Sequence, residues 1–263
     1  MRFFVHLAFF IFGAVLGSFA NVLIYRLPRK KSIVYPGSHC PTCKTSLQWI
    51  DNIPLISYVL LKGRCRYCQK KISVRYFLVE LFSALIFLMS AIYYDRLIAA
   101  MIAAIFFYFL MVASIIDARH FIIPDALSLT FLVFSSALLL SSGFLFPGLL
   151  PLVGKKGIMA GLSGSTMLLA FFLLVDTLSR LAFKKQGIGA GDIKLGLSIG
   201  IYTGNYSFLA PLFGYLLMAF LYPLVKPHVR DGYLPFGPFL SAGAVLTVFA
   251  GEALIKWYLK ALF

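Results

Sequence analysis

Apolar residues are grouped in long runs along this 263-residue chain, and short polar segments separate the runs. A run of about 20 apolar residues is long enough to cross the hydrocarbon core of a bilayer as a helix. The eight runs lie at residues 3–25, 76–94, 97–117, 125–146, 157–179, 192–204, 207–225 and 235–257. The sixth run is short and Gly-rich, which suits a tilted or broken helix. The pattern predicts an all-α polytopic membrane protein with about eight transmembrane helices.

The composition excludes a soluble globular domain of this length. Hydrophobic residues make up 61% of the chain and charged residues 13%, and the mean hydropathy is +0.92. The first apolar run begins where a secretory signal would, but it has no small-residue cleavage site and leads into the polar segment GSFANVLIYRLP. We therefore expect it to remain as a transmembrane helix.

Basic residues are concentrated in one polar segment. The net charge of +15 could indicate nucleic-acid binding, but residues 26–75 hold eleven Lys and Arg residues against a single acid, Asp51. By the positive-inside rule this segment is cytoplasmic, so the charge orients the protein in the membrane and no nucleic-acid partner is expected. The chain then divides into a first transmembrane helix (1–25), a cytoplasmic insertion (26–75) and a membrane-embedded body (76–263).

All four cysteines lie in this insertion as two C-x-x-C pairs with 21 residues between the pairs: Cys40, Cys43, Cys65 and Cys68. The spacing is typical of a zinc ribbon, in which four thiolates hold one Zn²⁺ tetrahedrally. Two disulfides are the alternative, but the reducing cytoplasm disfavours them. A site with four protein sulfurs has no open position for substrate, so we expect the zinc to be structural.

Two of the nine acidic residues stand at the ends of membrane helices at the same predicted depth. Asp117, in IIDARHFIIPD, ends the third helix, and Asp192, in GIGAGDIKLG, begins the sixth. Two carboxylates that approach closely in a low dielectric share one proton, so one can activate water while the other polarises a carbonyl. The pair predicts aspartic-peptidase chemistry. Gly189 and Gly191 lack a Cβ and would let an extended substrate approach Asp192.

Structural roles are the alternatives for several acids. Asp192 could simply cap the helix after its Gly-rich turn, and Asp125, which follows Ile123-Pro124, is suited to cap the fourth helix. Asp176 is expected to pair with Arg180 one turn later.

The other acids singled out are expected to be paired or solvated. Glu80, beside Arg75, is expected to pair with a basic neighbour, although its place near the cytoplasmic face leaves other roles open. Asp51, Asp95 and Asp231 lie in expected loops, where we expect them to be solvated.

Several segments, in this order, resemble the type IV prepilin peptidases, or leader peptidase/N-methyltransferases, of the G-x-G-D aspartic protease group. They are GSFANVLIYRLP (17–28), the CPTC and CRYC pairs, DNIPLISYVLLKGRCRYC (51–68), ISVRYFLVELFSALIF (72–87), IDARHFIIPD (116–125) and GAGDIKLG (189–196). The resemblance covers most of the chain. It implies that Asp117 and Asp192 are the catalytic aspartates of a bacterial inner-membrane enzyme acting at the cytoplasmic face.

The resemblance also implies the substrates, which are prepilins or pseudopilins of a pilus, a type II secretion system or a DNA-uptake apparatus. Because the cysteine-bearing insertion looks like that of bifunctional members, methylation of the new N-terminus with S-adenosylmethionine is implied too. No motif places the methyl donor. Polarity near the cytoplasmic face makes four residues weak candidates: Ser18, Asn21, Arg26 and Glu80.

Two other classes of protein, a transporter and a scaffold, are alternatives to a peptidase. In a small multi-pass transporter, intramembrane aspartates would relay protons or bind a cation, but such sites usually lie near the bilayer midplane. Asp117 and Asp192 are instead expected at the cytoplasmic edge. A scaffold that binds a partner through its zinc loop would leave the two matching carboxylates unexplained.

Overall fold

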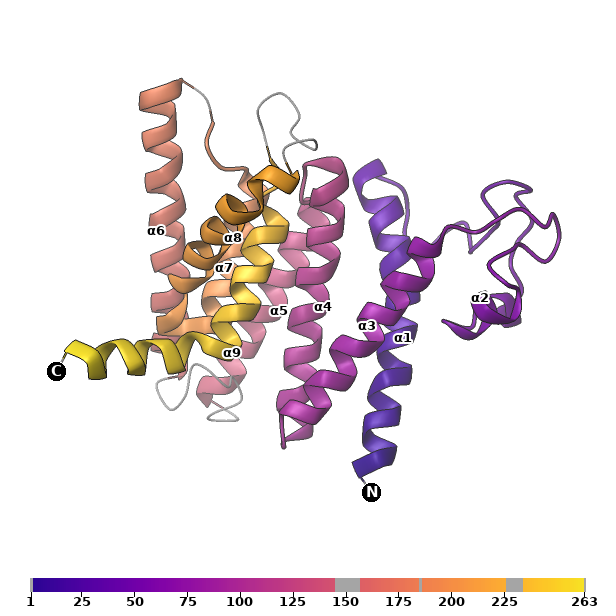
Figure 1. Ribbon diagram of the computed structural model, residues 1–263, viewed down its shortest axis with the longest axis horizontal. Helices are drawn as coiled ribbons and strands as arrows, with labels where there is room; N and C mark the ends of the chain where they lie inside the picture. The colour runs from indigo at the N-terminus through magenta and orange to yellow at the C-terminus, as the bar shows by residue number, and fades with distance from the viewer. Residues whose placement is uncertain (1, 145–156, 185, 226–233, 263) are drawn as a thin grey trace. The chain divides into compact units, whose positions relative to one another are not determined.

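The computed structural model describes residues 2–144, 157–184, 186–225 and 234–262. Within these ranges the chain is almost entirely helical, and the only β-structure consists of two isolated bridges in the insertion. Figure 1 shows the long helices α1 (Arg2–Arg26), α3 (Val74–Tyr93), α4 (Leu97–His120), α5 (Asp125–Phe144), α6 (Gly157–Phe183), α7 (Ala190–Thr203), α8 (Leu209–Val225) and α9 (Gly237–Leu262). The expected all-α membrane fold is confirmed.

Fewer of these helices span a membrane alone than the eight apolar runs suggested. Among the described residues, six helices are long and apolar enough to cross, and a seventh span results if α7 and α8 are counted together. The first arm of this pair, Ala190–Tyr206, is α7 extended by the 3₁₀ turn Gly204–Tyr206, and it meets the second arm, Leu209–Leu224, at 110° across a short break. Fourteen residues give α7 a length of about 21 Å, which is too short for a core of about 30 Å. The short sixth run is therefore half of a broken span or of a re-entrant pair.

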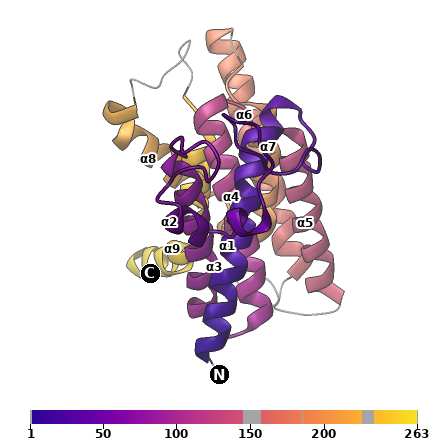
Figure 2. The same ribbon diagram turned by 90° about the vertical axis from the view of Figure 1, so that its right-hand side faces the viewer.

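The chain forms two compact units, Met1–Tyr108 and Phe109–Phe263. In the first unit α1 and α3 lie side by side, as Figures 1 and 2 show, because small residues let their backbones approach closely. A Cβ on Gly17 would lie 2.6 Å from the Cα atom of Glu80, and the Ser83 hydroxyl donates to the carbonyl oxygen of Gly13 at 2.6 Å. The insertion between these helices carries the short helix α2 (Ile56–Leu60) and the four cysteines.

In the second unit α6 packs against α7, and α8 packs against α9 (Figure 1). A Cβ on Gly200 would lie 2.6 Å from the carbonyl oxygen of Gly164, so the α6–α7 contact again requires small residues. Helix α5 packs against α7 as well. This arrangement brings the first turns of α5, α7 and α9 into the same unit as the last turn of α4, where the candidate active site lies.

Candidate functional site

Both candidate catalytic aspartates belong to the second unit. Asp117 lies in the last turn of α4, and Asp192 is the third residue of α7. The two side chains lie within electrostatic range of each other, because the negative charge of Asp117 acts on the carboxylate of Asp192. The structure therefore brings together the two residues that the sequence paired.

Asp117 is held by the start of α9. Its side chain is buried, with 5% of the residue exposed, and its Oδ2 atom accepts a hydrogen bond of 2.8 Å from the backbone N–H of Gly237. Gly237 is the first residue of α9, where backbone N–H groups have no partner within the helix. A Cβ at this position would lie 2.9 Å from the same carboxylate oxygen, so a larger residue would displace the Asp117 side chain. Sequence reasoning missed this contact, because Gly237 lies 120 residues from Asp117.

Asp192 does not cap its helix. The N-cap of α7 is Gly189, so the interpretation of Asp192 as an N-cap is wrong. The carboxylate instead reaches back toward the backbone N–H of Gly189, as an acid at the third helical position can. Its Oδ1 atom is shielded from solvent and has no hydrogen-bond partner among the residues that the structure describes. This oxygen is free to bind a group that is not part of the chain.

The segment before Asp192 is anchored to α6 by Asp176. The Asp176 Oδ1 atom accepts hydrogen bonds from the backbone N–H groups of Gly187, at 3.0 Å, and Ile188, at 3.4 Å. Its Oδ2 atom accepts from Arg180 Nε at 2.7 Å, which confirms the expected pair. Asp176 thus also fixes the backbone that leads to Asp192, a role that sequence reasoning did not assign to it.

The glycines of the G-x-G-D motif have close neighbours within the protein. A Cβ on Gly191 would lie 2.8 Å from the Cβ atom of Ile123, and a Cβ on Gly189 would lie 3.1 Å from Asp192 Oδ2. A side chain at position 191 would therefore collide with Ile123, and one at position 189 would press on the carboxylate of Asp192. Their role in substrate approach stays a prediction.

Asp125 begins α5 without capping it. The carbonyl oxygen of Pro124 accepts the first hydrogen bonds of this helix, from the backbone N–H groups of Leu127 and Ser128, so the cap position belongs to Pro124. The Asp125 carboxylate forms an ion pair of 2.5 Å with Lys194, two residues after Asp192. Asp125 therefore has a structural role, as expected, but the role is to link α5 to α7 through this ion pair and not to cap α5.

An aromatic pair lies beside the carboxylates. Tyr215 of α8 stacks on Phe236 with ring centroids 4.7 Å apart, and Phe236 directly precedes Gly237. The charge of Asp192 acts on the Tyr215 hydroxyl. No motif marks either aromatic residue, so the sequence alone did not link them to the site.

The four cysteines form one cluster in the first unit. Their Sγ atoms all lie within 4.8 Å of one another, and two of the separations are 3.9 Å (Cys40 to Cys68) and 4.0 Å (Cys43 to Cys65). All four are free thiols. Tetrahedral zinc with Zn–S bonds of about 2.3 Å separates its sulfurs by about 3.8 Å, so the donor set fits the ion. The Cys40–Cys68 and Cys43–Cys65 separations are far longer than an S–S bond of about 2 Å, so neither pair forms a disulfide here.

The two C-x-x-C turns repeat each other. The backbone N–H of Lys44 donates to the carbonyl of Cys40 and that of Gln69 to the carbonyl of Cys65, and both donors have positive φ angles of 58° and 57°. One isolated bridge closes each turn, between residues 39 and 46 and between residues 64 and 71. Two matching turns therefore present two sulfurs each to a common point.

Hydrogen bonds shift two of the thiols toward the metal-binding form. The side chain and backbone of Thr45 lower the pKa of Cys43 to about 6, and the backbone N–H groups of Cys68 and Tyr67 lower the pKa of Cys65. The backbone of Lys70 lowers the pKa of Cys68, but burial and the neighbouring thiols outweigh it and raise this pKa to about 11. A bound cation would oppose that rise, because it stabilises thiolates.

The weak candidates for the methyl-donor site have partners within the first unit. The Asn21 side chain donates to the carbonyl of Tyr76 at 3.0 Å, and Arg26 donates to the carbonyls of Ser32 and Pro36 at 2.9 and 2.6 Å. The Asn21 bond joins α1 to α3, and the Arg26 bonds hold the start of the insertion against α1.

Glu80 and Asp51 differ from expectation. Glu80 Oε2 accepts from the backbone N–H of Leu55 at 2.8 Å, and its carboxylate also receives a hydrogen bond from Ser18. The expected basic partner of Glu80 is thus wrong. Asp51 is 8% exposed and pairs with Arg66 at 2.6 Å, so the expectation that it is solvated is also wrong.

Comparison with known proteins agrees with the resemblance inferred from the motifs. Residues 11–94 match the family described as Bacterial Peptidase A24 N-terminal domain, and residues 104–224 match the Type IV leader peptidase family. No solved structure matches the chain.

Curated relatives match nearly the whole chain. The Type 4 prepilin-like proteins leader peptide-processing enzyme of Escherichia coli O78:H11 is 32% identical, over 95% of this chain and 93% of its own. The Prepilin leader peptidase/N-methyltransferase of Bacillus subtilis is 32% identical, over 95% and 96%. The protein of the same name from Neisseria gonorrhoeae is 28% identical, over 95% and 93%. This chain therefore belongs to the type IV leader peptidase family.

Proposed function

We propose that this protein is a membrane aspartic endopeptidase that removes the leader peptide of type IV prepilins or pseudopilins, with Asp117 and Asp192 as its catalytic pair. The observation that carries the proposal is a pair of carboxylates in one unit, of which Asp117 is buried and Asp192 has a solvent-shielded oxygen, with neither ion-paired within the described residues. The substrate class comes from the names of the relatives.

The geometry supports a water-activating mechanism. Two neighbouring carboxylates in a low dielectric hold one proton between them. The ionised member removes a proton from water while the water oxygen attacks the scissile carbonyl carbon, and the protonated member donates a hydrogen bond to the carbonyl oxygen. When the tetrahedral intermediate collapses, the C–N bond breaks and the leaving amine takes up a proton from the pair. The unpartnered Oδ1 atom of Asp192 is suited to contact either the water or the carbonyl.

A second reaction, methylation of the new N-terminus with S-adenosylmethionine, is proposed to depend on the region from residue 17 to 80. Its support is the name N-methyltransferase in the relatives and the cysteine cluster in this region. Cys40, Cys43, Cys65 and Cys68 would hold a structural zinc ion that stabilises the insertion.

The excess of basic residues in 26–75 supports an orientation with the insertion and the aspartates at the cytoplasmic face of a bacterial inner membrane. A proton-relaying transporter, the alternative, draws no support from the named relatives.

Purified protein carrying Asp117→Asn or Asp192→Asn, assayed by the mass of a prepilin substrate, tests the peptidase. Each variant is expected to lose cleavage by more than about a hundredfold, because general acid–base catalysis contributes at least that much. Asp125→Asn is the matched control, since this nearby acid is ion-paired with Lys194, and it should retain most activity. Near-normal cleavage by either of the first two variants refutes the pair.

A further inference from the structure

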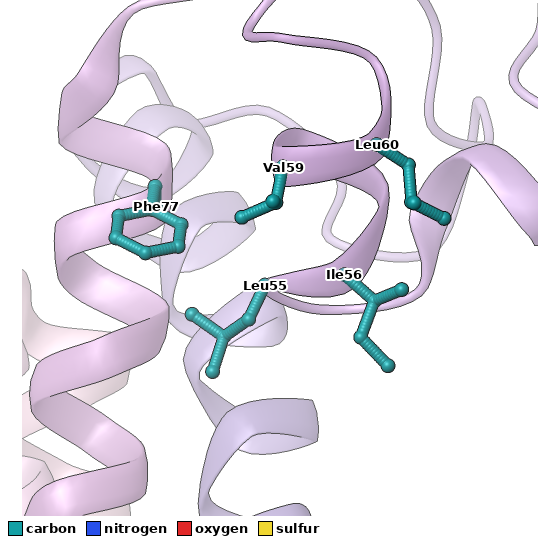
Figure 3. A pocket seen from close by; sticks show the side chains of 5 residues that line it. All are labelled: Leu55, Ile56, Val59, Leu60 and Phe77. Atoms are coloured by element: carbon teal, nitrogen blue, oxygen red, sulfur yellow. The ribbon is translucent and has the colours of Figure 1, made fainter.

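The helix α2 exposes an apolar surface next to a membrane-spanning helix. Figure 3 shows the side chains of Leu55, Ile56, Val59 and Leu60 around an open pocket of about 350 Å³, with Phe77 of α3 on its other side. Ile56, Val59 and Leu60 are 55%, 62% and 74% exposed. Exposed apolar patches with this degree of clustering mark binding surfaces or membrane contacts.

The depth of the pocket follows from the length of α3. Its twenty residues extend about 30 Å, which equals the thickness of the hydrocarbon core, so a span needs the whole helix from Val74. Phe77 and Glu80 then lie about 5 and about 9 Å inside the boundary, at 1.5 Å per residue. Because α2 contacts both residues, it lies within the bilayer interface, although it belongs to the polar insertion.

Two contacts fix α2 at this depth. The ring of Tyr58 packs on the ring of Phe77 with centroids 5.3 Å apart. Leu55 adopts a φ angle of 63°, which is unusual for a residue with a branched side chain, and its N–H donates to Glu80. This conformation is held by Glu80, which turns the chain into α2 beside the second turn of α3.

We infer that the apolar face of α2 is a lipid-binding surface, and that an acyl chain of the surrounding bilayer occupies its pocket. The depth of α2 matches the 5 to 10 Å at which interfacial helices typically place their apolar faces. The exposed Lys62 and Arg64 follow α2 directly, where they can meet anionic headgroups. Trp49, which is 77% exposed in the same insertion, is a residue type typical of the membrane interface.

This inference needs only a membrane protein and does not depend on peptidase activity. The apolar helix of a substrate is another occupant that the pocket could hold. A lipid is favoured because a lipid chain is present at this depth at all times, whereas a face this apolar would otherwise contact interfacial water between catalytic cycles.

Tryptophan fluorescence in proteoliposomes tests the inference with the full-length chain. Leu60→Trp is introduced into a parent that carries Trp49→Phe and Trp257→Phe, and Val59→Trp serves as a second probe if the first variant does not fold. The liposomes contain phosphatidylcholine and phosphatidylglycerol with bromine atoms near the carboxyl end of the acyl chains, and iodide is the aqueous quencher. Lys70→Trp, at an exposed position of the second C-x-x-C turn, is the matched control.

The tryptophan at position 60 is expected to be blue-shifted, strongly quenched by the brominated lipids and protected from iodide. The tryptophan at position 70 should show the opposite pattern. Quenching by iodide but not by lipid at position 60 would place α2 in water and overturn the inference. Protection from both quenchers would mean that protein covers the surface. Loss of the lipid quenching when purified prepilin is added would assign the pocket to the substrate.

Discussion

Replacing Asp176 with alanine is expected to slow peptide cleavage without preventing folding, because this carboxylate positions the backbone that leads to Asp192. The variant loses the bonds to Gly187 and Ile188 and the pair with Arg180. A hydrogen bond to a charged group contributes about 1.5–3 kcal/mol, whereas the pair with Arg180, whose side chain is 60% exposed, adds less than about 1 kcal/mol. Because the 3.4 Å bond to Ile188 is long and adds little, we count one full hydrogen bond and the ion pair, and expect a local cost of about 2–4 kcal/mol.

The loss should appear mainly in kcat. A displacement of about 1 Å in a catalytic group can cost about a hundredfold in rate, so Asp176→Ala is expected to cleave on the order of 10 to 100 times more slowly, with KM nearly unchanged. Asp176→Asn keeps an acceptor oxygen for the Gly187 N–H and should lose less. Arg180→Gln is the matched control, because it removes only the exposed partner.

The assay is steady-state cleavage of a purified prepilin in detergent, with thermal unfolding and zinc content measured in parallel. A folded Asp176→Ala enzyme that cleaves at the parent rate would refute the positioning role. A higher KM with an unchanged kcat would assign Asp176 to substrate binding instead. If Asp176→Ala unfolds, the kcat values of Asp176→Asn and Arg180→Gln are compared, since only Asp176→Asn weakens the contact with the backbone. A lower kcat for Asp176→Asn supports the positioning role, and equal values refute it.

Three further outcomes are expected. Purified protein should carry about one zinc per chain, and Cys40→Ser or Cys65→Ser should release it and make the insertion protease-sensitive; elemental analysis without zinc would contradict the metal site. Gly237→Ala should reduce cleavage by roughly tenfold or more, because its Cβ would displace the Asp117 carboxylate, and parent-like activity would show that the contact is dispensable. Asp192→Asn should still methylate pre-cut pilin with labelled S-adenosylmethionine, whereas label transfer lost together with cleavage would mean that the two sites are not separable.

The helices could be predicted from the sequence because hydrophobic length alone decides whether a segment crosses a bilayer. What the pattern could not supply was the geometry between segments. The break between α7 and α8 contains Gly204, whose φ angle of 57° ends α7, and a count of apolar residues does not record such a turn. The pattern therefore identified a weak sixth segment without fixing how the chain turns there.

The chemistry of single side chains was predictable where a motif fixed it locally. Each C-x-x-C motif fixes one turn locally, and the preference of zinc for four thiolates predicts that the two turns meet, although Cys40 and Cys68 are 28 residues apart. By contrast, the partner of Asp51 lies 15 residues away in a folded loop, and the Gly237 contact joins positions 120 residues apart. These contacts depend on tertiary structure, so neither composition nor spacing could reveal them.

Ion pairing separates most of the acids from the two candidate catalytic aspartates. Eight of the nine acids lie in the described part of the chain, and Asp231, which was expected to be solvated, lies outside it. Five of the eight form an ion pair: Asp51 with Arg66, Asp95 with Arg2, Asp125 with Lys194, Asp176 with Arg180 and Glu252 with Lys256.

The other three acids are Glu80, Asp117 and Asp192. Glu80 is occupied by neutral donors that hold the start of α2. Asp117 accepts one backbone hydrogen bond, and Asp192 has a buried oxygen with no partner in the described chain. A carboxylate buried in a membrane protein without a cation is costly, so such residues are rare and commonly mark functional sites. The distribution of partners therefore supports the proposal that Asp117 and Asp192 carry out the reaction, because the carboxylate of Glu80 is already engaged by Leu55 and Ser18.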